Sequence, residues 1–184
     1  MLATDDLRAE HEGILRMLAV LESMAGKLGG PDAPPPAQWE AVLEFLRVFA
    51  DKCHHGKEED ILFPAMERAG VPRQGGPIGV MLHEHTLGRG HIAAMAAALG
   101  DLRTGGPGAV QDLADAALAY AALLTQHIAK ENNVLFPMAE RLLGEPAIDA
   151  MHADFERIEA ERIGPGRHEA FHALLDQLSA AHLS

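Results

Sequence analysis

Long stretches of this chain mix apolar and polar residues, and clusters of glycine and proline separate one stretch from the next. Alanine and leucine are abundant, runs of β-branched residues are absent, and aromatic residues make up only 4% of the chain. Alanine and leucine have high helix propensity, whereas strands favour β-branched and aromatic side chains. The pattern therefore predicts an all-α protein.

The glycine and proline clusters indicate where the predicted helices end. Helices are expected over about residues 4–28, 37–69, 78–102, 109–143, 146–162 and 167–182. The first four are long and joined by short connections, which is typical of an up-down-up-down four-helix bundle. We expect this bundle to span residues 1–143 and residues 144–184 to form a C-terminal helical extension that packs on it.

The pattern His-x-x-x-Glu-x-x-x-Leu-Phe-Pro occurs twice. One copy begins with His54 and Glu58, and the other with His127 and Glu131. A histidine and a glutamate four residues apart on a helix point the same way, with Cβ atoms about 6 Å apart. Each copy therefore presents one imidazole and one carboxylate to the same space, and both groups are metal ligands.

Each copy ends in a proline within a predicted helix. Pro64 and Pro137 stand at the same position of the repeat. Proline removes one backbone hydrogen bond from a helix and bends it. We expect matching kinks in the second and fourth helices.

One further histidine precedes each copy, within the pairs Glu10-His11 and Glu84-His85. These histidines come early in the first and third helices, whereas the His-x-x-x-Glu patterns come late in the second and fourth. Early and late positions of antiparallel neighbours lie at the same level of a bundle. The candidate metal ligands are therefore His11, His54, Glu58, His85, His127 and Glu131.

Four imidazoles and two carboxylates exceed the needs of one small cation. They suit two metal ions bridged by Glu58 and Glu131, with about four protein donors for each ion. Mixed imidazole and carboxylate ligands with open positions favour iron, ahead of manganese or zinc. The open positions leave room for an oxo bridge, water, dioxygen or nitric oxide.

Two other residues are candidates because of their spacing. His55 and Glu59 are also four apart, but their counterparts in the second copy, Ile128 and Asn132, break the repeat, so His55 is set aside. Tyr120 stands seven residues before His127 on the same helix stripe. It is expected to line the ligand pocket and donate a hydrogen bond, with plain core packing as the alternative.

The remaining residues with metal-binding side chains near the repeat are expected to lie outside the metal site. His83 and His91 lie away from the stripe of His85 and are expected to face solvent. Cys53 precedes a candidate ligand but points off its stripe, so a buried thiol is expected.

Charge and cysteine content restrict the function classes. The formal net charge is −12, which argues against binding to nucleic acid or to an anionic membrane surface. The single cysteine excludes an internal disulfide and is typical of a reducing compartment. No stretch is long and apolar enough to predict a membrane span, and the start is not of signal-peptide type. We expect a cytoplasmic protein.

The C-terminal extension contains His168-Glu169-Ala170-Phe171-His172, which matches the zinc-protease pattern His-Glu-x-x-His. That chemistry also needs a third ligand and a substrate cleft. A short amphipathic helix near the C-terminus favours surface histidines or a cap over the bundle, and leaves room for a weak additional metal site.

The two His-x-x-x-Glu copies, their Leu-Phe-Pro extensions and the two preceding histidines resemble the hemerythrin family in its bacterial HHE cation-binding form. The resemblance covers about residues 4–143. It implies a left-handed four-helix bundle with a non-haem di-iron centre that binds or senses oxygen or nitric oxide.

The resemblance also leaves an alternative function open. Oxygen-carrying hemerythrins place a second histidine four residues from the lone histidine of the third helix, where this chain has Met81 and Arg89. The set of four histidines and two glutamates is similar to that of bacterial iron-centre repair proteins. An iron-handling protein or a di-iron redox enzyme acting on peroxide, nitric oxide or iron-sulfur centres is the alternative.

Overall fold

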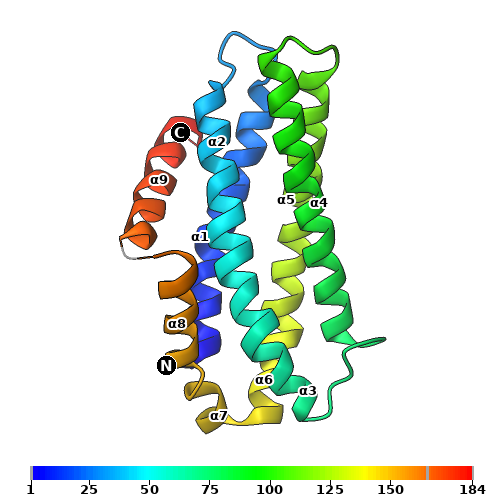
Figure 1. Cartoon of the computed structure of the whole chain (residues 1–184), viewed down its shortest axis with the longest axis vertical. Helices are drawn as coiled ribbons and strands as arrows, with labels where there is room; N and C mark the ends of the chain where they lie inside the picture. The colour runs from blue at the N-terminus through cyan, green and yellow to red at the C-terminus, as the bar shows by residue number, and fades with distance from the viewer. Residues whose placement is uncertain (1, 165, 184) are drawn as a thin grey trace.

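Four long helical rods run side by side along the long axis of the molecule (Figure 1). The computed structural model describes residues 2–164 and 166–183, and within these ranges it contains helices and no strand. The all-α prediction is confirmed. The first rod is α1 (Ala3–Lys27), and the third is α4 (Pro77–Arg103). The second consists of α2 (Pro36–Phe45), η1 (Leu46–His55), η2 (Glu58–Leu62) and α3 (Phe63–Arg68), and the fourth of α5 (Ala109–Lys130), η3 (Glu131–Leu135) and α6 (Phe136–Leu143).

The second and fourth rods contain wide turns at matching places. In η2 and η3 a backbone hydrogen bond joins residues five apart, as in a π-helix. The Phe63 N–H donates to Glu58 O, and the Phe136 N–H donates to Glu131 O. Each wide turn ends two residues before a proline, which has no N–H to donate. The sequence predicted a disturbance at Pro64 and Pro137, and it takes the form of these turns, which begin at the two candidate glutamates.

The C-terminal extension consists of α7 (Glu145–Asp149), α8 (His152–Arg162) and α9 (Arg167–His182). A single helix was expected over residues 146–162, and this expectation is wrong, because the chain turns at Ala150 and Met151. Ile148, Met151 and Phe155 are all buried in one apolar cluster. The turn lets α7 lie under the rods while α8 runs up beside the second rod and contacts η1.

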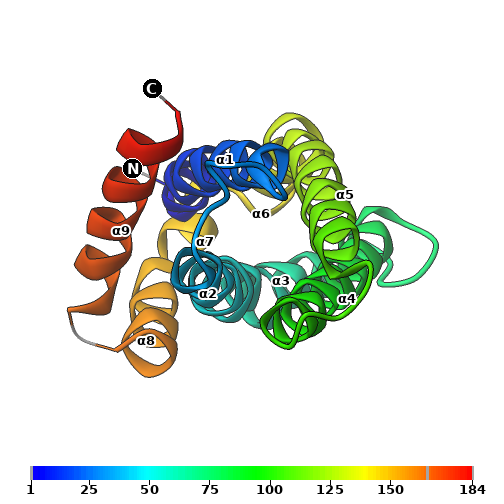
Figure 2. The same ribbon diagram turned by 90° about the horizontal axis from the view of Figure 1, so that it is seen from above.

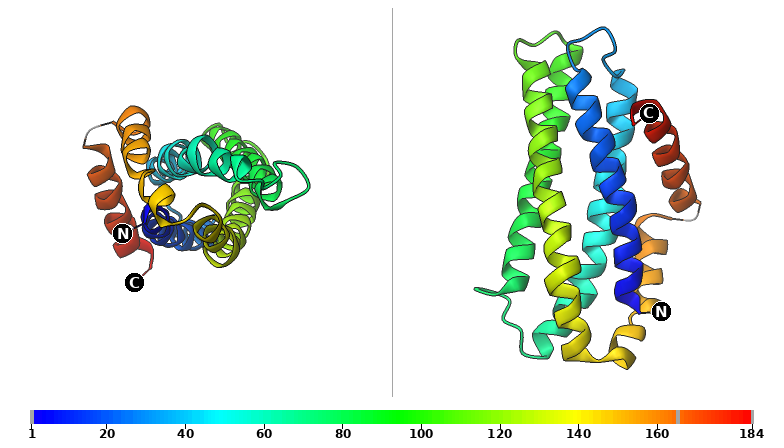
Figure 3. Two further views of the ribbon diagram at one scale, coloured as in Figure 1. Left: turned by 90° about the horizontal axis from the view of Figure 1, so that it is seen from below. Right: turned by 180° about the vertical axis from the view of Figure 1, so that it is seen from behind.

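The extension covers one side of the four rods only. Viewed along the rods, α8 and α9 lie against α1 and α2, away from α4 and α5 (Figures 2 and 3). Gly56 permits this approach, because a Cβ there would overlap the Arg162 guanidinium. Arg162 donates to the Lys52 carbonyl at 3.0 Å and pairs with Asp60. The last residue of α8 is thereby fastened to the second rod.

Two apolar clusters fill the space between the rods. One contains Trp39 and Phe45 and is joined by Phe171 of α9. The other contains the phenylalanines of the repeated motif, Phe63 and Phe136. The polar centre lies between the clusters along the chain: on α1, Leu7 belongs to one, Ile14 to the other, and His11 stands between them. Among the described residues, no helix has the length and apolar character needed to cross a membrane.

Candidate metal centre

The four predicted histidines meet as two close pairs in the middle of the rods. His11 Nε2 lies 2.9 Å from His54 Nε2, and His85 Nε2 lies 3.1 Å from His127 Nε2. Each side chain is only 1% exposed. The rods therefore bring together, in the protein interior, residues that are far apart in the sequence.

The outer nitrogen of every ring is held by an oxygen acceptor. The Nδ1 partners are Asn132 for His11, Glu10 for His54, Glu59 for His85 and Glu84 for His127, at 2.7–2.8 Å. Carboxylate and amide oxygens accept hydrogen bonds, so each ring donates from Nδ1. A neutral ring with its proton on Nδ1 directs the lone pair of Nε2 into the centre, which is the tautomer that binds a metal.

Glu58 and Glu131 lie between the two histidine pairs. The Glu131 oxygens are 3.1 Å from His11 Nε2 and 3.0 Å from His127 Nε2. The Glu58 oxygens are 3.7 Å from His54 Nε2 and 3.4 Å from His85 Nε2. Each carboxylate thus reaches one histidine of each pair, as a group bridging two metal ions would.

The chemistry of these donors fits metal ions. All four carboxylate oxygens are buried, and within the described residues none has a partner with hydrogen-bond geometry. Buried polar groups left in this way cost free energy, about 1–3 kcal/mol each. Lone pairs and carboxylate oxygens facing one another in a buried space repel unless a cation or a proton lies between them. The residues present are therefore suited to hold metal ions.

In the metal-free protein, protons must take over this role. Burial and the charge of Glu131 raise the pKa of Glu58 well above its usual value. Burial alone would also raise the pKa of Glu131, but His127 and His11 hold it well below the usual range. Burial and the neighbouring His11 lower the pKa of His54 to about 4. A proton on Glu58 therefore reduces the repulsion between the two carboxylates, and metal binding would displace this proton.

Phenylalanines of the repeated motif cover the centre from below. Phe136 stacks on His11, with ring centroids 5.4 Å apart, and Phe63 stacks on His85 at 6.0 Å. Each phenylalanine directly follows a wide turn that begins at one of the two candidate glutamates, Glu58 or Glu131. The Leu-Phe-Pro sequence therefore positions a glutamate, covers a histidine of another rod and closes the turn.

Comparison with known proteins agrees with this geometry. The family described as Hemerythrin HHE cation binding domain matches residues 2–139. The chain belongs to this hemerythrin family. Uncharacterized proteins of Mycobacterium tuberculosis and Mycobacterium bovis are 25% identical over 177 residues, which are 96% of this chain and 68% of theirs. The iron-sulfur cluster repair protein YtfE of Edwardsiella ictaluri is 38% identical over 100 residues, 53% of this chain and 44% of that protein. No solved structure matches.

A fifth histidine lies beside the four predicted ones. His55 is 3% exposed and stacks on His85 with ring centroids 3.8 Å apart. Its Nδ1 donates to Asp51 at 3.3 Å, and its Nε2 is buried with no partner in the described part of the chain. A donor atom of His55 groups with donors of Glu58, His85 and His127. The sequence analysis set His55 aside because the repeat has Ile128 in its place, but the structure places its ring beside the predicted ligands.

The remaining candidates lie where simple packing puts them. Tyr120 is buried in the upper apolar cluster, and its hydroxyl has no hydrogen-bond partner among the described residues. Its role in lining a ligand pocket stays a prediction. His83 is exposed, as expected. Cys53 is buried, and burial raises the pKa of its thiol to about 12.

Two lysines complete the outer layer, and the sequence analysis missed them. Lys57 pairs with Glu10, and Lys130 pairs with Glu84. Lys57 directly precedes Glu58, and Lys130 directly precedes Glu131. Their partners Glu10 and Glu84 each directly precede a candidate histidine. This signal was visible in the repeat, since Glu-His and Lys-Glu recur at matched positions.

Proposed function

We propose that this protein is a non-haem di-iron protein that binds oxygen or nitric oxide between its rods. The proposed ligands are His11 and His54 for one ion, His55, His85 and His127 for the other, and Glu58 and Glu131 as bridges. The observation that carries the proposal is the meeting of imidazole lone pairs and carboxylate oxygens in one buried space, with every outer nitrogen already engaged. Iron would supply redox chemistry and open coordination positions.

The spacing of the histidine pairs fits two nitrogen donors on one metal ion. Two nitrogen atoms in adjacent octahedral positions, each at roughly 2.1 Å from the ion, would lie about 3.0 Å apart. Tetrahedral geometry, which zinc prefers, would separate them by about 3.4 Å. The distances of 2.9 Å and 3.1 Å match the octahedral value.

Burial supports a small ligand. The six residues selected from the repeat are at most 1% exposed, and His55 is 3% exposed. Phe63 and Phe136 cover two of the rings. A diatomic molecule can pass between packed side chains during their ordinary motion, whereas a larger substrate would require the rods to separate.

Metal analysis and gas binding test this proposal. Protein expressed in iron-replete cells should contain about two irons per chain; one zinc per chain, or no metal, would contradict it. Oxygen or nitric oxide added to the reduced protein should change its visible spectrum, and removal of the gas should restore the original spectrum.

An iron-handling protein or a di-iron redox enzyme is the second candidate function. The likeness to the iron-sulfur cluster repair protein YtfE over about half of this chain favours it. Peroxide or nitric oxide would be reduced at the centre with electrons from a redox partner, or iron would be given up to an iron-sulfur centre. A spectral change that persists after the gas is removed, or iron that leaves readily to a chelator, would favour this second function over reversible binding.

The proposal extends to the fold and the setting. We propose that the four rods form the up-down-up-down bundle of hemerythrins and that the protein works in the cytoplasm. The buried free thiol of Cys53 is consistent with a reducing compartment.

A further inference from the structure

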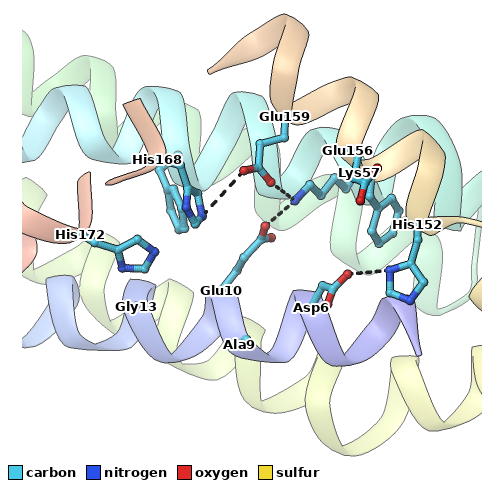
Figure 4. Close-up of a pocket in the computed structure, with 12 residues that line it drawn as sticks. Asp6, Ala9, Glu10, Gly13, Lys57, His152, Glu156, Glu159, His168 and His172 are labelled. Atoms are coloured by element: carbon cyan, nitrogen blue, oxygen red, sulfur yellow. Dashed lines mark hydrogen bonds and ion pairs between the residues drawn. The ribbon is translucent and has the colours of Figure 1, made fainter. Parts of the chain in front are cut away.

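The C-terminal extension builds a pocket of about 260 Å³ against α1 (Figure 4). His168 and His172 of α9 stand four residues apart and therefore lie on one face of that helix. Both rings turn into the pocket, where the carboxylates of Glu10 and Glu159 also lie. The proposed di-iron function uses neither histidine.

In this pocket His168 lies between a second imidazole, His172, and the Glu159 carboxylate (Figure 4). The rings of His168 and His172 have centroids 4.6 Å apart, and His168 Nε2 is 4.0 Å from Glu159 Oε1. Donors bound to one ion at roughly 2.1 Å lie about 3.0–3.4 Å apart, so His172 and Glu159 would have to swing towards His168 to share an ion with it. His168 and Glu159 are about one-third exposed, which leaves an ion a path from solvent.

The other polar groups of the pocket are already engaged. Lys57 sits between Glu10 and Glu159, pairing with the first and lying 3.2 Å from Glu159 Oε2. A second cation therefore has no place between those two carboxylates. His152 donates to Asp6 at 2.8 Å. The open donors are the two α9 rings and Glu159 Oε1.

We propose that His168, His172 and Glu159 form a peripheral site for a divalent transition-metal ion, separate from the di-iron centre. Two histidines and one carboxylate, with a position left for water, are a ligand set suited to Zn²⁺, Co²⁺ or Ni²⁺. The site does not make the protein a protease. Glu169, which would be the general base in the His-Glu-x-x-His pattern, is exposed and lies outside this pocket.

The site stands at the end of a line of contacts to the proposed di-iron centre. Glu159 contacts Lys57, Lys57 contacts Glu10, and Glu10 accepts from His54 Nδ1. An ion that draws Glu159 towards α9 removes one of the two carboxylates that neutralise Lys57. The peripheral ion would then alter the setting of His54 without touching it.

Titration of the iron-loaded, full-length protein with Co²⁺ tests the site. The wild type should bind one Co²⁺ with a visible spectrum typical of nitrogen and oxygen ligands, while its iron content stays constant. His172→Gln and Glu159→Gln should each weaken Co²⁺ binding at least about tenfold, since loss of even an indirect partner costs 10–100-fold at metal sites. His172 is exposed, so its replacement should leave the fold intact.

His83→Gln is the matched control, because it removes another exposed imidazole, on α4. It should bind Co²⁺ as the wild type does. The proposal is overturned if the iron-loaded wild type takes up no Co²⁺, or if His83→Gln weakens binding as much as His172→Gln. Equal iron contents in all variants would show that any loss of Co²⁺ arises at this pocket and not at the di-iron centre.

Discussion

The two halves of the candidate centre share one plan but differ in what covers them. Lys57 and Lys130 occupy the same position of the repeat and pair with equivalent glutamates. The Lys57 side chain is 3% exposed, under Phe155 and Glu159 of α8, whereas that of Lys130 is 41% exposed. The extension therefore converts one of two equivalent surface ion pairs into a buried one.

The same difference appears in the residues beside the ligands. Gly56 leaves room for Arg162, whereas the second half has Ala129, which is exposed. His55 places an additional nitrogen beside Glu58, His85 and His127, whereas its counterpart in the second half is Ile128. Under the proposed function, the features that occur in both halves would serve metal binding as such. The features that occur once would make the two proposed metal positions unequal, and they dock the extension.

Loss of a bridging carboxylate should have the largest effect, because it removes a ligand from both ions. In Glu58→Ala and Glu131→Ala we expect less than about half of the wild-type iron, since each of these glutamates is proposed to bind both ions. Glu44→Ala, at an exposed site on α2, is the control and should retain full iron. Full iron in either bridging variant, measured by elemental analysis, would remove that glutamate from the centre.

Removal of iron should lower the melting temperature by about 10 °C, because a ligand that binds only the folded state stabilises it by about 3–4 kcal/mol at high saturation. The metal-free protein should stay helical, since both apolar clusters persist. Circular dichroism checks both statements. Equal melting temperatures at pH 7 would argue against one shared site.

The difference in melting temperature between the iron-loaded and the metal-free protein should become smaller in acid. In the metal-free fold the pKa of His54 is about 4, below its usual 6.5. The unfolded chain therefore takes up the proton first, and the metal-free protein loses stability as the pH falls from 6.5 to 4. Histidines must also be deprotonated to bind metal, so the iron form loses its advantage over the same range. A gap between the two melting temperatures that widens below pH 6 would contradict this.

The paired lysines test the comparison between the halves directly. Lys57→Met should destabilise the protein by about 3 kcal/mol, because it leaves Glu10 buried beside the site of a lost charge. Lys130→Met should cost less than about 1 kcal/mol, since its ion pair is solvent-screened. Urea unfolding measures both. Similar values would mean that the extension does not seal the first half.

Replacement of His55, the proposed ligand that occurs in only one half, should have a smaller effect. His55→Ile gives the first half the residue of the second. We expect iron affinity at one position to fall about 10–100-fold, the range seen when support of a metal site is lost, while the other position stays filled. His83→Ala is the control. An unchanged iron affinity and visible spectrum in His55→Ile would show that its imidazole is not a ligand.

Sequence and structure agree where a local rule decides the outcome. Glycine and proline clusters mark the end of α1, both ends of α4 and the start of α5, so these boundaries were predictable. The break between α7 and α8 has no glycine or proline at Ala150 and Met151, and follows from burial of three apolar side chains that the pattern alone does not reveal.

The same distinction holds at the centre. The repeat identifies the six candidate ligands because each type occurs at matched positions in both halves. It rejected His55, because a residue present once fails a test for residues present twice, and its place is determined by packing on His85 and by Asp51. The partners of the ring nitrogens come from neighbouring rods, so only the assembled fold relates Glu10 to His54 and Glu84 to His127.

If Glu58 and Glu131 bridge two iron ions, the two ions form one magnetically coupled centre. A low-temperature Mössbauer spectrum of the oxidised, iron-loaded protein tests this bridging, because bridged ferric ions couple their spins. We expect essentially all iron to appear as a spin-coupled pair with no net magnetism, with two unequal components arising from the two ligand sets. Magnetically split signals of isolated ferric ions would contradict it.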